Sequence, residues 1–313
     1  MRRFIVSDIH GLGNFYYSVM SYLDNISKSE EIELYINGDL FDRGLESAEI
    51  LLDIKNRIQN GNFKIIYLGG NHELLMYEEY ERRKKGISNY FNDWYDNGGY
   101  MTDDLLNELL DYDKDKILEV VDFVSSLKIY HKFDEKINGK NILLVHAACP
   151  IDINDECKLK VSNGDSIYYY VWAREYDPFM PFRCRIGNDK YFVVVGHTPV
   201  NTPFGYEYHK NQNYLSIDGG CSMYACGEFD FEHFPLVEVC DGYLRILTFN
   251  NNNEIIYGNY FDGSSSKPFN KDELEKERLN LNPKLKVKKL TKNEDGVVLY
   301  KYWKKYICVI LFT

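Results

Sequence analysis

The chain has 313 residues, of which 44% are hydrophobic, enough for one large domain with a substantial core. Its formal net charge of −11 argues against a general nucleic-acid-binding protein, because such proteins present an electropositive surface. No apolar run approaches the roughly 18 residues that a membrane span needs, and charged residues precede any signal-like apolar run. With seven irregularly spaced cysteines that suit reduced thiols, we expect a cytoplasmic protein with no membrane or nucleic-acid partner.

The first 85 residues alternate three times between an apolar strand pattern and a helical pattern. The expected strands and helices, in chain order, are strand 4–6, helix 12–26, strand 31–37, helix 45–58, strand 63–68 and a helix from residue 73 to about 85. Such alternation predicts right-handed crossovers and a parallel sheet. In sheets of this kind, ligands bind at the carboxyl ends of the strands.

The rest of the chain changes character twice. Charged and aromatic residues with helical spacing predict a helical insert at about 76–128, beside the site. From residue 129 onward strand patterns dominate, with 165–173 as the one convincing helix, so we expect a second sheet packed face to face on the first. The Gly- and Ser-rich stretch 262–268 predicts a boundary between a catalytic domain, 1–262, and an extension, 263–313, packed against it.

Five short polar clusters each follow an apolar strand pattern. They are Asp8-Ile9-His10-Gly11, the stretch 38–44, the stretch 69–73, His146, and Gly196-His197-Thr198-Pro199. Divalent metals take carboxylate, amide and imidazole ligands, and a bridging carboxylate can hold two cations that together support an in-line displacement at phosphorus. Each cluster alone is a weak signal, but their succession at strand ends predicts a two-metal site. The candidate ligands are Asp8, His10, Asp39, Asn71, His146 and His197.

Three of these clusters also resemble a known signature. Asp8-Ile9-His10-Gly11, Gly38-Asp39-Leu40-Phe41-Asp42-Arg43-Gly44 and Gly70-Asn71-His72-Glu73, with two later histidines, resemble the calcineurin-like metallophosphoesterase superfamily. The pattern is most similar to the bacterial phosphoprotein phosphatase branch, and the resemblance covers about residues 3–220. It implies an α/β fold, a four-layer α-β-β-α sandwich with a helical insert and a C-terminal extension.

The resemblance implies a dinuclear centre with a defined ligand set. Asp8 and His10 would hold one metal, Asp39 would bridge both, and Asn71, His146 and His197 would hold the other. Mn²⁺ is the ion that the resemblance leads us to expect, with an Fe/Zn pair or Mg²⁺ as alternatives, since ligand type alone does not choose between them.

The remaining motif residues would act on the phosphoryl group. His72, paired with Asp42, would be the general acid that protonates the leaving oxygen, because an imidazole beside a carboxylate can carry a proton near neutral pH. Arg43 and Arg174 would bind the phosphoryl oxygens, for which the forked guanidinium is suited. Asn71 would contact the substrate as well as a metal.

The implied reaction is hydrolysis of a phosphate monoester, in which a metal-bridging hydroxide attacks phosphorus in line. Relatives that hydrolyse diadenosine tetraphosphate symmetrically usually carry Asp in place of Glu73 and lack the acidic residue at Asp42. Because this chain has both, we expect a protein serine/threonine phosphatase, with dual specificity as a variant, acting on a phosphorylated protein. The alternatives are a symmetrical diadenosine tetraphosphate hydrolase, a small-molecule or nucleotide phosphoesterase, or a catalytically silent metal-binding scaffold.

Two positions depart from the family pattern. Ser7 stands where the family often has Gly, and His146-Ala147-Ala148 replaces the usual His-Gly-Gly turn. Since Ala tolerates a positive φ poorly, we expect the loop after His146 to bend differently and to alter the substrate cleft.

Overall fold

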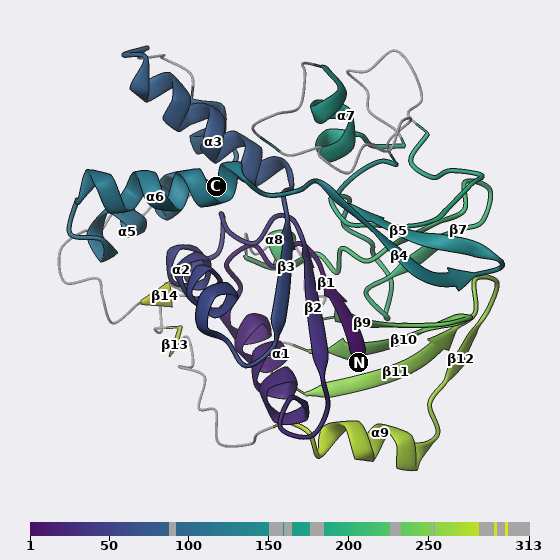
Figure 1. Cartoon of the computed structure of the whole chain (residues 1–313). Coiled ribbons are helices and arrows are strands. Elements are labelled where there is room, and N and C mark those ends of the chain that lie inside the picture. The colour runs from purple at the N-terminus through teal and green to yellow at the C-terminus, as the bar shows by residue number, and fades with distance from the viewer. Residues whose placement is uncertain are drawn as a thin grey trace.

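The computed structural model describes residues 1–87, 92–149, 159, 165–175, 185–225, 233–250, 252 and 254–281, with two short strands at 291–292 and 298–299. Two β-sheets face each other, and helices cover their outer sides (Figure 1). The arrangement confirms the expected α/β class with two packed sheets. Among the described residues, no helix has both the length and the apolar character that a membrane crossing requires.

The larger sheet is built from both halves of the chain. In spatial order its strands are β12 (Ser266–Pro268), β11 (Ile255–Phe261), β10 (Tyr243–Phe249), β9 (Phe234–Cys240), β1 (Arg2–Val6), β2 (Ile32–Asn37) and β3 (Lys64–Leu68). Strands β1, β2 and β3 are parallel, with Phe4 opposite Leu34 and Leu34 opposite Ile65. Their carboxyl ends therefore lie together at one edge.

The second sheet has the order β4 (Tyr130–Ile137), β5 (Lys140–Val145), β6 (Phe192–Val195), β8 (Tyr214–Ser216), β7 (Glu207–His209). Strands β4 and β5 form an antiparallel hairpin whose turn residues, Asn138 and Gly139, both have positive φ. That geometry suits the twist of a tight hairpin. Strands β5, β6 and β8 are parallel, so their carboxyl ends also meet.

The helices lie outside the sheets and at the ends of the strands (Figure 1). Their bounds are α1 (Gly13–Ile26), α2 (Ser47–Asn60), α3 (Asn71–Lys84), α4 (Asp93–Asp96), α5 (Tyr100–Leu109), α6 (Lys114–Ser125), α7 (Asp165–Trp172), α8 (Cys221–Ala225) and α9 (Lys271–Arg278). Helix α2 buries Ala48, Leu51 and Ile54, three residues apart on one face, against the core. Helices α4 to α6 confirm the expected helical content of the insert.

Two apolar clusters hold these layers together. One lies between the sheets and contains Ile5 of β1, Leu144 of β5 and Phe192 of β6. The other lies between sheet and helices and contains Val6 of β1 and Val145 of β5. Because strands such as β1 and β5 bury side chains on both faces, they read as continuous apolar runs.

The expected strand-rich second sheet is only partly confirmed. Strands β4 to β8 form it, but β9 to β12 join the first sheet, where β9 pairs antiparallel with β1. Helix α8 and strands β7 and β12 carried no clear sequence pattern. They are three to five residues long, too short for a periodicity to emerge.

The region after residue 262 contacts the rest of the molecule at several points. Strand β12 pairs with β11, and Glu277 of α9 accepts hydrogen bonds from Tyr22 of α1 and Arg245 of β10. Strands β13 (Thr291–Lys292) and β14 (Val298–Leu299) pair with each other. The division at 262/263 stays a prediction, and most of the extension beyond residue 281 lies outside the described residues.

Candidate metal centre

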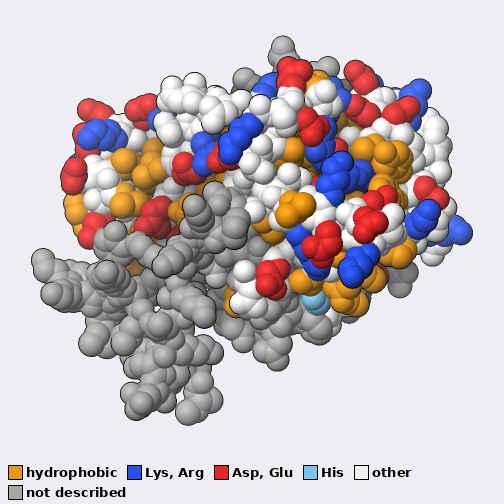
Figure 2. Space-filling view, turned by 90° about the horizontal axis from the view of Figure 1, so that it is seen from below, with side chains coloured by type: hydrophobic (Ala, Val, Ile, Leu, Met, Phe, Trp, Pro, Cys, Tyr) orange, Lys and Arg blue, Asp and Glu red, His pale blue; other side chains and the backbone are white. Residues whose placement is uncertain are grey.

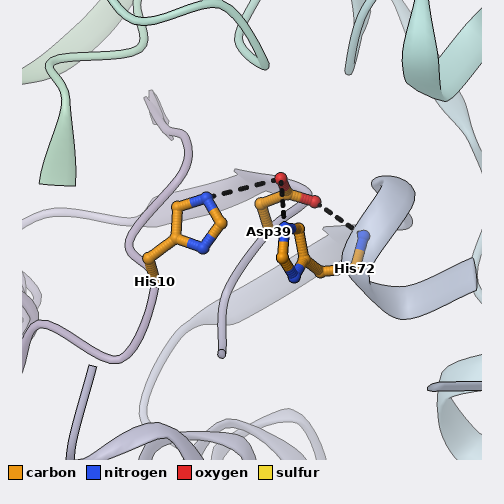
Figure 3. A group of neighbouring side chains, drawn as sticks. All are labelled: His10, Asp39 and His72. Carbon is orange, nitrogen blue, oxygen red and sulfur yellow. Dashed lines mark hydrogen bonds and ion pairs between the residues drawn. The ribbon is translucent and has the colours of Figure 1, made fainter. Parts of the chain in front are cut away.

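Asp39 is the meeting point of the predicted ligands. It follows β2 and is 2% exposed. The Nε2 atoms of His10 and His146 each lie 3.4 Å from a carboxylate oxygen of Asp39, and Nε2 of His72 lies 3.9 Å away. Figure 3 shows His10 and His72 pointing at this carboxylate from two different segments of the chain. Three imidazoles from three strand ends thus face one carboxylate.

The potential ligand atoms form two groups that share Asp39. His10, Asp39 and His72 make one group, and Asp39, His146 and His197 make the other, with all ligand atoms of a group within 4.8 Å of one another. All five residues are buried. A carboxylate common to two clusters is the arrangement expected of a bridging ligand.

Asn71 and Asp8 complete the set. Oδ1 of Asn71 lies 3.0 Å from Nε2 of His146 and 2.9 Å from Nδ1 of His197. Oδ1 of Asp8 accepts a hydrogen bond from the backbone N–H of His197 at 2.9 Å, and its Oδ2 accepts one from Ser7. The structure therefore brings all six predicted ligands, with His72, into one buried region.

The backbone at these positions is strained. Non-glycine residues rarely adopt positive φ, yet Asp8, His10, Asp39 and His197 have values of 53°, 47°, 51° and 65°. Gly38 explains how the segments approach so closely, because a Cβ there would lie 2.6 Å from Cα of Gly70. Strain of this kind concentrates at functional sites, where the surrounding structure enforces it.

The charges of the site are poorly balanced by the protein alone. Burial and the carboxylate of Asp218 raise the pKa of Asp8 well above its usual value. Burial also opposes ionisation of Asp39, but His146 and His72 outweigh it and hold the pKa of Asp39 below its usual value. Burial opposes protonation of His146, yet Asp39 and Asp8 raise its pKa to about 10. Without a metal, these buried carboxylates are neutralised only by protons on themselves or on neighbouring histidines. A bound cation would stabilise their ionised form.

The donor set fits divalent cations for two further reasons. Nε2 of His72 is buried and has no hydrogen-bond partner, which is costly for a polar atom unless another group binds there. The set combines carboxylate and amide oxygens with imidazole nitrogens, as expected for Mn²⁺, Zn²⁺ or iron.

The comparison of protein families agrees with this geometry. The model of the family described as calcineurin-like phosphoesterase matches residues 1–232, about three quarters of the chain. This chain belongs to the calcineurin-like phosphoesterase family. It is therefore a metal-dependent phosphoesterase, and the residues around Asp39 are its candidate metal centre.

Several solved structures have low similarity to this chain. A cold-active protein-tyrosine phosphatase of Shewanella is 16% identical, with a TM-score of 0.47 over 86% of this chain and 80% of that one. A protein serine/threonine phosphatase from Saccharomyces cerevisiae is 16% identical, with a TM-score of 0.47 over 80% of each chain. A putative diadenosine tetraphosphatase is 14% identical, with a TM-score of 0.42 over 79% of this chain and 93% of that one. No curated protein matches the sequence.

Two arginines of this phosphoesterase flank the centre. Burial lowers the pKa of His10 and of His197, and the positive charges of Arg43 and Arg174 act in the same direction on His10 and His197 respectively. Arg43 therefore lies close enough to act on His10, and Arg174 close enough to act on His197. Nη1 of Arg174 donates to Thr198 Oγ1 at 3.2 Å, beside His197.

Glu73, part of the predicted motif but not of the predicted site, organises two of the strand ends. Its carboxylate accepts backbone N–H groups of Gly70 at 2.7 Å, Asp39 at 2.9 Å and Leu40 at 3.0 Å, and the hydroxyl of Tyr67. The carboxylate thereby ties the turn after β2 to the start of α3. Since it is fully buried and surrounded by donors, it supports the position of Asp39.

Asp218 is the acidic residue that the sequence interpretation missed. It is 1% exposed, and burial raises its pKa to about 6. It follows β8, as the predicted ligands follow their strands, so its place after an apolar run was the signal that could have identified it.

The loop after His146 avoids the strain of its neighbours. Neither Ala147 nor Ala148 has a positive φ, and both backbone N–H groups donate to the carbonyl of Tyr170 in α7. These two hydrogen bonds attach the loop to α7, and its effect on a substrate cleft stays a prediction. His131, outside the predicted site, packs against the rings of Tyr35 and Phe133, which also contact each other.

Proposed function

We propose that this phosphoesterase is a phosphoprotein phosphatase that hydrolyses phosphoserine and phosphothreonine monoesters. The observation that carries the proposal is the buried pair of His72 and Asp42, whose Nδ1 and Oδ2 atoms lie 2.7 Å apart. An alkoxide leaving group is strongly basic, so its departure near neutral pH needs a positioned proton donor. A pair of this kind is less necessary for a phosphoanhydride, whose leaving group is a much weaker base.

The metal centre would hold two divalent cations, with Mn²⁺ as the expected ion. Asp8 and His10 would bind one, Asn71, His146 and His197 the other, and Asp39 both. When bound, such cations lower the pKa of a water molecule and neutralise charge on the phosphoryl group. The buried carboxylates and the unpaired nitrogen of His72 support this assignment.

The chain's own side chains would orient the substrate. Arg43 and Arg174, whose positive charges act on His10 and His197 respectively, would bind the nonbridging phosphoryl oxygens. Nε2 of His72 would then donate its proton to the leaving oxygen, while the Asp42 carboxylate stabilises the imidazolium before transfer.

We further propose a cytoplasmic protein that acts without nucleic-acid or membrane partners. Over the described part of the face in Figure 2, Lys and Arg side chains are interspersed with Asp and Glu rather than gathered together. The net charge of −11 supports the same view, since nucleic acid would be repelled by such a chain.

The experiment compares three substrates at equal enzyme concentration, with and without Mn²⁺. We expect kcat/KM for a phosphoserine peptide to exceed that for diadenosine tetraphosphate, and metal removal to abolish both activities. His131→Asn serves as a matched control, since this histidine lies outside the site, and it should leave all rates unchanged. A clear preference for the dinucleotide would overturn the proposal, and no turnover of p-nitrophenyl phosphate under any condition would indicate a silent scaffold.

A further inference from the structure

The carboxylate of Asp42 has three hydrogen-bond partners, two of them in the helical insert. Nε1 of Trp94 in α4 donates to Oδ2 at 2.8 Å, and Oγ1 of Thr102 in α5 donates to Oδ1 at 2.6 Å. The third partner is Nδ1 of His72 at 2.7 Å from Oδ2. All four side chains are at most 1% exposed, so water does not compete for these contacts.

These partners indicate which ring nitrogen of His72 carries hydrogen toward Asp42. The indole N–H is only a donor, and an ionised carboxylate is only an acceptor. With Trp94 and Thr102 donating to it, Asp42 is satisfied as the carboxylate, and Nδ1 of His72 is then the nitrogen that carries hydrogen toward it. Nε2 of His72 is left facing Asp39 with no hydrogen-bond partner. The nitrogen that faces the metal centre is thus the one available to the substrate.

The insert is built to hold Trp94 in place. The Trp94 ring packs against Tyr80 with centroids 6.0 Å apart, and a Cβ at Gly99 would lie 2.2 Å from its Nε1. Beside it, Asp103 accepts hydrogen bonds from Tyr80 at 2.7 Å and Arg83 at 2.8 Å, which join α5 to α3. These hydrogen bonds to Asp103 hold the insert on α3 but do not involve Asp42.

We propose that Trp94 and Thr102 are positioning residues that hold Asp42, and through it His72, in the geometry needed to protonate the leaving oxygen. The helical insert would then control proton delivery, while the strand ends hold the metals. The inference rests on the proposed role of His72 as general acid.

The test uses leaving groups that differ in their need for a proton. Trp94→Phe and Thr102→Val keep apolar bulk but remove the donor. For a phosphoserine peptide, whose leaving group needs protonation, we expect each variant to lower kcat about tenfold, since a hydrogen bond to a charged group is lost. For p-nitrophenyl phosphate, whose leaving group needs little help, we expect kcat to change less than about threefold. KM for both substrates should be unchanged.

Two further variants test whether the loss is specific to the hydrogen bonds that Asp42 accepts. Thr102→Ser retains the hydroxyl and should restore activity on the peptide. Tyr95→Phe removes a hydroxyl that donates to Asp103 in the same insert, so it should disturb the insert without the selective loss. Thermal unfolding of every variant checks that the fold persists, and Thr102→Val remains decisive if Trp94→Phe fails to fold.

His72→Asn separates this inference from the proposed function. If His72→Asn shows the selective loss on the peptide but Trp94→Phe and Thr102→Val do not, the positioning role is refuted and the general acid stands. If His72→Asn itself affects both substrates equally, the proposed function fails, and the inference with it. Equal losses on both substrates in the two insert variants would also overturn the positioning role.

Discussion

The same strands behave differently along their length and at their carboxyl ends. Along β5, Ile142 and Leu144 pack between the sheets, while Leu143 and Val145 pack on the helix side, and all four are fully buried. One residue later the chain reaches His146, which lies in a buried polar environment beside Asp39. The interior between the sheets is apolar, and none of these four strand residues has a positive φ. The strand ends, by contrast, combine charge, burial and positive φ.

The contrast shows how the site can exist. Buried charges and positive φ at residues such as Asp8 and Asp39 cost free energy, and they persist only where surrounding structure holds them. The apolar strands below supply that support because they are fixed on both faces. Changes at the strand ends should therefore affect chemistry first, and changes between the sheets should affect folding first.

The largest effect is expected from Asp39→Asn. The change removes the carboxylate common to both ligand groups, so metal content and activity should fall together. We expect kcat/KM to drop by more than the roughly 10- to 100-fold that is typical when a residue supporting a metal ligand is lost. Metal analysis and turnover of p-nitrophenyl phosphate measure both quantities. Asp53→Asn, on the outer helix α2, is the control, and an Asp39→Asn enzyme with near-normal rates would contradict the bridging role.

Variants of His72 and His146, one from each ligand group, should lose different properties. His72→Asn should lower kcat on a phosphoserine peptide by about 10²- to 10⁴-fold, the range typical of a lost general acid, while metal content stays unchanged. His146→Asn should instead lose metal, because its Nε2 lies near both Asp39 and Asn71. Metal loss in the His72 variant would instead show that this histidine is a metal ligand. Its ligand atom lies close enough to those of His10 and Asp39 for that role.

Between the sheets, Leu144→Ala should act on stability rather than chemistry. Removing a fully buried leucine side chain costs about 2–5 kcal/mol of unfolding free energy, because a cavity replaces packed atoms. Urea unfolding measures the change, and activity per folded molecule should remain close to that of the wild type. Leu109→Ala, at an exposed position in α5, is the matched control. A Leu144→Ala protein of normal stability would mean that this cluster does not support the site.

The smallest effect concerns pH and a histidine outside the site. Burial lowers the pKa of His131 from 6.5 to about 4, so the unfolded chain binds a proton more readily than the folded chain does. The contribution to stability is therefore complete above about pH 6.5 and is lost as the pH falls toward 4. His131→Phe should show a smaller drop in melting temperature between pH 7 and pH 5 than the wild type. An equal drop in both proteins would remove His131 as a cause of acid sensitivity.

Local patterns were sufficient for the elements that begin the chain. The apolar runs at β1, β2 and β3, each followed by a helical pattern, predicted the parallel strands correctly. The same reasoning assigned β9 to the wrong sheet, because a strand pattern reports burial but not the partner. Strand β9 pairs with β1, more than 230 residues away, and that choice depends on the whole fold.

The candidate site was likewise predictable from the sequence only in part. Strand-end placement and the family resemblance together named six ligands that the structure brings into one region. Neither named Asp218 as an acidic neighbour, nor Trp94 and Thr102 as the partners of Asp42, since these contacts join distant segments. In the sequence, each of these three residues is a single position within an ordinary strand or helix pattern, so no motif marks it.

By itself the sequence determined which residue types stand at the strand ends and in what order, because strands, turns and apolar faces follow from local periodicity. It thereby determined the family and the chemistry of the ligands. Only the tertiary structure decided that Asp39 lies between two groups of histidines and that Nε2 of His72 faces the centre without a partner. Both properties depend on segments that are far apart in the sequence and meet at the site. The packing of the two sheets and of the helical insert fixes how those segments lie relative to one another.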